Sequence, residues 1–182
     1  MDFSDVRRAQ MSDQEELADL WLQLLNEQAE QDDRMGIAED AIDRWQNDFP
    51  VWLEDETARI YVAEADGETL GFASARRWGP PPIYEESSEV YLDELYVRPD
   101  DRRKGYGTQL VNAVRNWTDD LGARRIRLRV LTANQDARAF WAGQDAIPMT
   151  MTFTIEGPEP DDSPVDDEGS KKIGFSSERT AK

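Results

Sequence analysis

Apolar residues near the start of the chain predict two amphipathic helices. The first covers residues 12–31, where one face repeats at steps of three and four: Leu17, Leu20, Trp21, Leu24 and Leu25. Ser12 and Glu15 are the predicted capping box of this helix. The second helix has the same spacing, and Pro50 is expected to disturb its end. Its apolar positions are Ala38, Ala41, Ile42, Trp45 and Phe49.

Stretches rich in alternating and β-branched residues predict the strands. Asp66-Gly67, with a β-rich run on each side, is a strong hairpin signal. Arg98-Pro99 is expected to end the strand after that hairpin. The other strands follow from alternation between the two faces of a sheet. Outside the hairpin, the predicted strands are residues 3–10, 89–97, 124–131 and 147–156.

Two more helices, at residues 107–121 and around 134–141, complete the expected order β-α-α-β-β-β-α-β-α-β. Consecutive strands favour an antiparallel meander, whereas the later β-α-β crossing needs a parallel neighbour. The predicted class is therefore α/β (α+β), with a mixed, mostly antiparallel central sheet flanked by helices. We expect one domain over residues 1–156 and an acidic, flexible tail over 157–182.

The composition of the chain excludes several kinds of catalytic site and argues against some classes of partner. The chain has neither Cys nor His, which excludes thiol nucleophiles, disulfides and histidine triads, and no metal site is predicted. Acidic residues number 39 against 21 basic ones, for a net charge of −18. We expect this acidity to reflect a halophilic-type surface adapted to a high-salt cytoplasm. It argues against nucleic acid as a partner, because phosphates would be repelled. The start of the chain has no signal-peptide core, and no run predicts a membrane span, so we expect a cytoplasmic protein without membrane contact.

A short basic, glycine-rich segment lies between the predicted strand 89–97 and the helix that follows. Gly105 and Gly107 lack Cβ atoms where the backbone turns, so several N–H groups can point outward together at the positive end of a helix dipole. Such a turn favours a phosphate, and the basic side chains of residues 102–104 add charge at its rim. Neither the P-loop pattern nor the G-x-G-x-x-G dinucleotide pattern is present.

The pattern Arg102-x-x-Gly105-x-Gly107, after a strand and before an amphipathic helix, resembles the signature of the GNAT superfamily of N-acetyltransferases. The preceding Leu95-x-Val97-x-Pro99 matches that family's fourth strand and its exit. Downstream, Asn134, Ala137, Phe140 and Trp141 match another family segment. The resemblance covers residues 3–156 and includes the predicted element order.

The resemblance implies acetyl-CoA as cofactor. Backbone N–H groups of residues 103–108 would hold the pyrophosphate, with the Thr108 hydroxyl as a further donor. The fourth strand would diverge from the fifth and expose backbone groups to the pantetheine arm. The implied cofactor-binding residues are Leu95, Tyr96, Val97, Arg102, Arg103, Lys104, Gly105, Tyr106, Gly107, Thr108, Asn134, Ala137 and Phe140.

The implied chemistry is acyl transfer from a thioester to an amine. A backbone N–H at or near Leu95 would polarise the acyl carbonyl. Either Asp93 or Glu94 would serve as the base; the two point to opposite faces of the strand, and the sequence leaves the choice open. The family's usual tyrosine acid falls at Trp141, which cannot donate a proton in that role. Tyr84, Tyr91 and Tyr96 are the alternatives.

The predicted function is therefore transfer of an acetyl group from acetyl-CoA to a primary amine of a small molecule, peptide or protein, by a monomer or homodimer. The alternative is a weak or inactive acyl-CoA-binding relative that acts as a sensor or partner protein. A third hypothesis, RNA binding through the basic side chains of residues 102–104 and the arginine face of residues 125–129, is disfavoured by the net charge and by the absence of interleaved exposed aromatic residues. Loop acids Glu85, Glu86 and Glu89 are possible contacts for a cationic amine.

Overall fold

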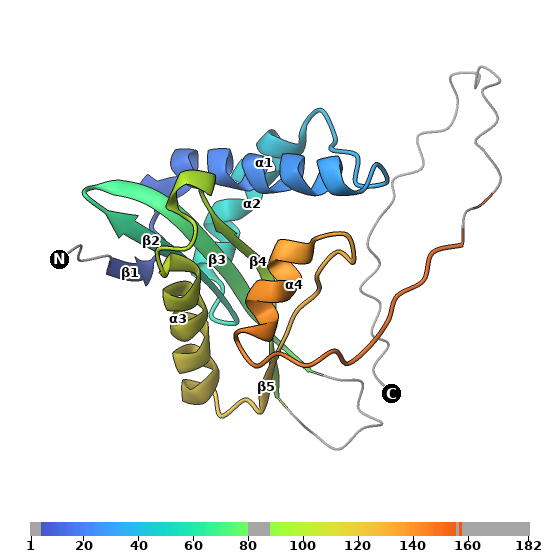
Figure 1. The fold of residues 1–182 in the computed structure, drawn as a ribbon. Coiled ribbons are helices and arrows are strands. Elements are labelled where there is room, and N and C mark those ends of the chain that lie inside the picture. The colour runs from blue at the N-terminus through green and yellow to red at the C-terminus, as the bar shows by residue number, and fades with distance from the viewer. Residues whose placement is uncertain (1–4, 80–87, 156, 158–182) are drawn as a thin grey trace, which may run out of the picture. The chain divides into compact units, whose positions relative to one another are not determined.

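One five-stranded sheet, with helices on both of its faces, organises the first unit of the protein, Met1–Ile147 (Figure 1). The structure is a computed structural model that describes residues 5–79, 88–155 and 157. The elements follow the chain in this order: β1 (Asp5–Arg8), a 3-10 turn (Met11–Asp13), α1 (Gln14–Gln31), α2 (Ala41–Glu54), β2 (Ala58–Ala65), β3 (Glu68–Trp78), β4 (Glu89–Val97), a second 3-10 turn (Pro99–Asp101), α3 (Tyr106–Asp120), β5 (Arg125–Arg127) and α4 (Gln135–Ala142).

The sheet is mixed, as the sequence predicts. Strands β1 to β4 pair antiparallel in chain order, and β5 pairs parallel to β4. The hairpin at Asp66-Gly67 joins β2 to β3, with both residues at positive φ, 53° and 79°. The meander followed by one α3 crossover explains why only the last pair is parallel.

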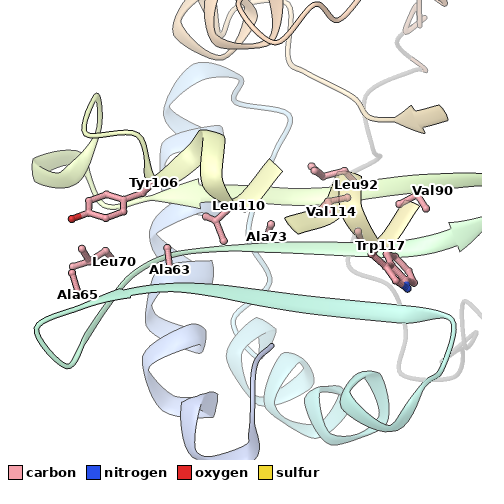
Figure 2. Close-up of a cluster of buried hydrophobic side chains, with 11 residues drawn as sticks. Ala63, Ala65, Leu70, Ala73, Val90, Leu92, Tyr106, Leu110, Val114 and Trp117 are labelled. Atoms are coloured by element: carbon pink, nitrogen blue, oxygen red, sulfur yellow. The ribbon is translucent and has the colours of Figure 1, made fainter. Parts of the chain in front are cut away.

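Two apolar cores lie on opposite faces of the sheet. Figure 2 shows Tyr106, Leu110, Val114 and Trp117 of α3 in a row against side chains of β2, β3 and β4. On the other face, α1 and α2 pack against the sheet through residues that include the predicted helical stripes. The buried members of this second core are Ala9, Leu17, Ala18, Leu20, Trp45, Phe49, Ile60, Val62, Phe72 and Tyr96. None of the helices among the described residues is both long and apolar enough to cross a bilayer.

The start of α1 corrects one expectation. Ser12 and Glu15 do not form its cap, because Ser12 lies inside the 3-10 turn that precedes the helix. Asp13 organises this entry instead: its carboxylate accepts the Gln10 N–H at 2.7 Å and two Arg7 guanidinium bonds at 2.7 and 2.9 Å. The Arg7 bond is the main cause that lowers the pKa of Asp13. A local box between Gln10 and Asp13, together with the ion pair to Arg7, therefore takes the place of the predicted Ser12–Glu15 box.

Pro50, predicted to disturb the end of the second helix, lies inside α2, which continues to Glu54. Proline lacks the N–H that would bond to the carbonyl four residues earlier, which is that of Gln46. The side-chain amide of Gln14 in α1 donates to the Gln46 carbonyl at 2.7 Å. The neighbouring helix thus satisfies the group that proline leaves unpaired.

The predicted last strand, residues 147–156, is not a strand over the residues that the structure describes there. β5 is also shorter than the predicted 124–131, and β1 is shorter than 3–10. The apolar members of the alternating segment, among them Met151 (80%) and Phe153 (79%), are exposed. Alternation predicts a strand only where a partner supplies backbone hydrogen bonds. Residues 148–182 form a second unit, and the predicted tail, apart from Gly157, lies outside the described residues.

Glu89 is a structural acid and not the amine contact that its position beside the loop indicated. Its side chain is only 2% exposed, and its carboxylate pairs with Arg125 at 3.1 Å and Arg127 at 2.9 Å. The arginines come from β5, directly across from the start of β4. Glu89 therefore ties the short parallel strand to the sheet.

We expect Glu89→Gln to lower the free energy of unfolding by about 2 kcal/mol, because it removes the charge from hydrogen bonds to a buried carboxylate, while the arginines, 46% and 28% exposed, keep access to water. Urea denaturation followed by circular dichroism measures this loss. The matched control is Glu68→Gln, since Glu68 is 71% exposed in its pair with Arg98. The control should change stability by less than about 0.5 kcal/mol. Equal midpoints for the two variants would contradict the structural role of Glu89.

Candidate active site

The two strands that flank the candidate site separate soon after they meet. Among the described residues, β5 pairs with β4 only at Glu89, Val90 and Tyr91. β4 continues to Val97, paired with β3 on its other side. The expected divergence of the fourth and fifth strands is therefore present. Over the part of the chain that the structure describes, one edge of β4 has no strand partner from Leu92 onward.

Backbone groups of Leu95 and Val97 face this open edge. The Arg98 N–H donates to Leu70 on β3 at 2.9 Å, and backbone direction alternates along a strand. The backbone N–H and C=O of Tyr96 therefore point toward β3, while those of Leu95 and Val97 point away from it. The Val97 carbonyl is used by the Arg102 side chain, whose Nε donates to it at 2.9 Å. The N–H groups at Leu95 and Val97 are directed toward the space that β5 leaves.

The basic, glycine-rich segment of residues 102–107, called the glycine elbow below, has the backbone shape expected of an anion site. Gly105 caps α3 with a φ of 99°, a left-handed conformation that glycine adopts without penalty. Arg103 is also left-handed, with a φ of 66°. Gln109 is the residue whose N–H bonds back to Gly105, at 3.1 Å. The N–H groups of residues 106–108, including Tyr106 and Gly107, thus have no carbonyl of their own helix to bond.

α4 lies against the elbow. A Cβ on Gly107 would come within 3.4 Å of the Phe140 ring, so glycine allows the two helices to approach closely. The Thr108 hydroxyl accepts a bond from Gln144 at 3.1 Å and keeps its own hydrogen for another acceptor. Asn134 caps α4, where its Oδ1 accepts the Ala137 N–H at 2.8 Å. Asn134, Ala137 and Phe140 therefore lie on or next to the helix that borders the elbow.

The basic side chains of the elbow are not all free for phosphate. Arg102 binds both oxygens of Glu27 on α1, at 2.7 and 2.8 Å. Lys104 pairs with Asp101 at 2.8 Å. Two of the three basic side chains expected at the rim are therefore paired with acids. The ion pair of Arg102 with Glu27 therefore links the elbow to α1.

The candidate acids for the leaving thiolate lie in different surroundings. Tyr96 is buried on the α1 face, and its hydroxyl donates to Glu27 at 2.9 Å. Burial and the Glu27 carboxylate together raise its pKa to about 12. Tyr91 lies beneath the Arg76 guanidinium, 5.5 Å from the ring centroid. Tyr84 lies outside the described residues. Trp141 packs against the α3-side core and edge-on to Phe140, at 5.0 Å between ring centroids.

Glu94 is the more organised of the two candidate carboxylates. A register shift opposite Asp93 separates the pairs Ala75–Leu92 and Ser74–Glu94. Glu94 then points to the α1 face, where Trp21 Nε1 donates to its Oε1 at 2.7 Å and Ser74 Oγ donates to its Oε2 at 2.6 Å. Burial raises the pKa of Glu94 above its ordinary value of 4.5, and the two bonds act against that rise.

Asp93 is the extra residue of this bulge and lies nearer to solvent. Its two oxygens each accept a bond from Arg76 Nε at 3.1 Å. Burial raises its pKa as well, opposed by the charge of Arg76. The Asp93 side chain is 32% exposed within an ion pair whose arginine is 56% exposed. The carboxylate with a fixed, neutral set of donors is thus that of Glu94.

Sequence analysis did not single out three residues of this site: Trp21, Glu27 and Ser74. Trp21 falls in the apolar stripe of α1, and its position there indicated only a core residue. Its indole N–H was the available signal, because buried Trp usually finds an acceptor. Ser74 and Glu27 carry no local signal, since their partners are 20 and 75 residues away along the chain.

Comparison with known proteins places this geometry in a family. The model of the "Acetyltransferase (GNAT) family" matches residues 18–144. An aminoglycoside N(6')-acetyltransferase type 1 of Stenotrophomonas maltophilia is 36% identical over 51% of this chain and 61% of its own length. An uncharacterised N-acetyltransferase of Archaeoglobus fulgidus is 31% identical over 54% of this chain and 67% of its own length. The chain thus spans about three fifths to two thirds of these curated relatives.

A solved structure, that of the aminoglycoside N-acetyltransferase AAC(6')-Iy in complex with CoA, has the same fold, with a TM-score of 0.71. The match covers 86% of this chain and 96% of that one, at 22% sequence identity. The family match spans more than half of this chain, and it includes the diverging strands and the glycine elbow. The chain therefore belongs to the GNAT family of acetyltransferases.

Proposed function

We propose that the protein is an acetyl-CoA-dependent N-acetyltransferase that acts on a primary amine. The observation that carries this proposal is the elbow at the open edge of β4, where Gly105 adopts a φ of 99° in front of α3. The N–H groups of residues 106–108 point out of the helix end and suit a pyrophosphate. The edge groups of Leu95 and Val97 suit an amide-containing arm. The residues present therefore fit coenzyme A.

Glu94 and Leu95 divide the chemistry between them in this proposal. Bound acetyl-CoA supplies the acyl thioester. The Leu95 N–H, directed to the open edge, would donate to the acyl oxygen as charge develops there. Glu94, in its ionised form, would accept the proton of the attacking amine directly or through one water. As the C–N bond forms, the C–S bond would break, and the coenzyme A thiolate would leave and take a proton from water. Its carboxylate also attracts the ammonium form of the substrate.

An amino sugar is the first acceptor to test, because the Stenotrophomonas relative is named for aminoglycosides. A peptide amine is the second. RNA binding loses support, since Arg125 and Arg127 are paired with Glu89. The alternative of an acyl-CoA-binding protein without turnover is favoured by one observation: Trp141, at the position of the family's usual acid, is packed against the core.

Release of free thiol from acetyl-CoA, followed with a chromogenic disulfide in the presence of a panel of amines, tests the proposal. The chain lacks cysteine, so the protein itself contributes no thiol background. We expect release that depends on both protein and amine, with mass spectrometry showing the amine heavier by one acetyl group. Tight coenzyme A binding without release for any amine would overturn transfer and favour the sensor hypothesis.

A further inference from the structure

Both oxygens of the Glu94 carboxylate are bonded to side chains from other elements. Trp21 of α1 donates to one and Ser74 of β3 to the other, at 2.7 and 2.6 Å. We propose that Trp21 and Ser74 are positioning residues that hold Glu94 in the orientation and ionisation state that proton transfer requires. This inference rests on the proposed role of Glu94 as the base.

The donors favour one form of the carboxyl group. An indole N–H can only donate, so Trp21 cannot accept a bond from a protonated Glu94. Hydrogen bonds to an ionised carboxylate are stronger than those to its neutral form. The bond from Trp21 therefore stabilises the form that can take a proton from an amine. The remaining lone pairs of the carboxylate stay available to substrate or water.

An aromatic cluster between α1 and α2 fixes the direction of the Trp21 indole. Its ring centroid lies 5.9 Å from that of Trp45. Trp45 in turn stacks on Phe49 at 4.9 Å and meets Trp52 edge-on at 5.9 Å. Trp45 and Phe49 are buried. The position of the indole N–H is thus set by the core on this face and not by the bond to Glu94 alone.

The bulge in the β3–β4 pair sets the position of Ser74. Ser74 lies directly opposite Glu94 in the register, and the next pair is Ala75 with Leu92. Residues opposite each other in an antiparallel pair project to the same face of a sheet. The extra residue, Asp93, therefore brings the hydroxyl and the carboxylate together on the α1 side.

The groups around Glu94 determine how its pKa will change when one of its hydrogen-bond donors is removed. Burial and the neighbouring charge of Asp93 raise its pKa, whereas the bonds from Ser74 and Trp21 lower it. The groups that α1 and β3 contribute here, an indole and a hydroxyl, do not titrate. Further along the same face, the Tyr96 hydroxyl is bonded to Glu27. Loss of the Trp21 N–H should therefore raise the pKa of Glu94 further.

The first measurement observes the bond without using activity. In the ¹⁵N-labelled full chain, the indole ¹H–¹⁵N signal of Trp21 is the one lost in Trp21→Phe. We expect its chemical shift to titrate together with the Glu94 carboxyl carbon as the pH passes through the raised pKa of Glu94, because the bond weakens when Glu94 takes up a proton. This titration should be absent in Glu94→Gln. An indole signal that does not move with Glu94 overturns the inference.

The second measurement is the pH dependence of kcat/KM with a single amine, so that the amine's own titration is common to all variants. We expect Trp21→Phe to move the acidic limb to higher pH and to lower kcat/KM about tenfold at a given pH on that limb. On the high-pH plateau, kcat/KM of Trp21→Phe should stay within about threefold of the parent protein's value. Ser74→Ala should move the limb in the same direction. Trp52→Phe is the matched control, because Trp52 belongs to the same aromatic cluster but is not the donor to Glu94.

The outcomes separate this inference from the function on which it rests. A limb that moves in Trp21→Phe and Ser74→Ala, but not in Trp52→Phe, supports the positioning role. A limb that stays in place in Trp21→Phe and disappears in Glu94→Gln overturns the positioning role and leaves the base assignment intact. If Glu94→Gln keeps both the limb and the rate, the base assignment fails, and a catalytic role for Trp21 fails with it.

Discussion

Gly105→Glu is expected to abolish coenzyme A binding, with a loss of affinity of more than about a hundredfold. Two physical effects add together. The backbone at Gly105 has a φ of 99°, which a side chain makes unfavourable by about 1–2 kcal/mol. The new carboxylate would also lie at the helix N-terminus, where the backbone N–H groups are proposed to hold a pyrophosphate. Repulsion between the two anions accounts for the larger part of the loss.

Isothermal titration calorimetry with coenzyme A measures this effect, and Gly122→Glu is its matched control. Gly122 follows the other end of α3 and is also left-handed, with a φ of 62° and open space where a Cβ would be. The control carries a comparable backbone strain and the same added charge, yet it should bind coenzyme A like the parent protein. Gly105→Ala separates strain from charge. Unchanged affinity in Gly105→Glu would rule out the elbow as the phosphate site.

Glu94→Gln is expected to lower kcat about a hundredfold, the usual contribution of a positioned general base. Glutamine keeps the size of the side chain: its carbonyl oxygen can accept the bond from Trp21, and its NH2 group can donate to the Ser74 hydroxyl oxygen, so the fold should be retained. The pKa of Glu94 is raised by burial above its ordinary 4.5. The base works only when ionised, so the rate should rise with pH through that raised pKa. The variant should lose this rise.

Asp93→Asn distinguishes the two neighbouring carboxylates. Asp93 is held by Arg76 at the more exposed side of the bulge, and we expect its loss to lower kcat by less than about fivefold. Steady-state rates of thiol release, with melting temperatures recorded for both variants, test the difference. The opposite ranking, a large loss in Asp93→Asn and a small one in Glu94→Gln, would assign the base to Asp93.

The sequence predicted most of the fold because much of it depends on local patterns. The helical stripe through Leu17 and Leu20 and the turn at Asp66-Gly67 reflect interactions between near neighbours in the chain. The same patterns were not sufficient where a distant partner decides the outcome. Alternation over residues 147–156 indicates a strand only if another strand pairs with it. Pro50 stays inside α2, where Gln14 of another helix bonds the carbonyl that it leaves free.

In the candidate site, too, some features follow from residues close together in the chain and others depend on distant contacts. The glycine elbow could be recognised from the sequence, because its left-handed turn depends on Gly105 itself. Alternation along β4 predicted that Asp93 and Glu94 face opposite sides, but the bulge interrupts that alternation, and Asp93 pairs with Arg76, two residues from Ser74 on β3. Alternation could not show which of them faces α1, because the bulge in the β3–β4 register sets that direction. Nor could it show that Arg102, a candidate phosphate ligand, is bonded to Glu27.

By itself, the sequence determined the family, the order of most elements and the position of the glycine turn before α3, since each is encoded in residues close together in the chain. Only the tertiary structure decided which carboxylate is held as a candidate base. Trp21, Ser74 and Glu94 belong to three different elements, 73 and 20 residues apart for the two bonds. Packing of α1 against the sheet brings them together, and burial there raises the pKa of Glu94.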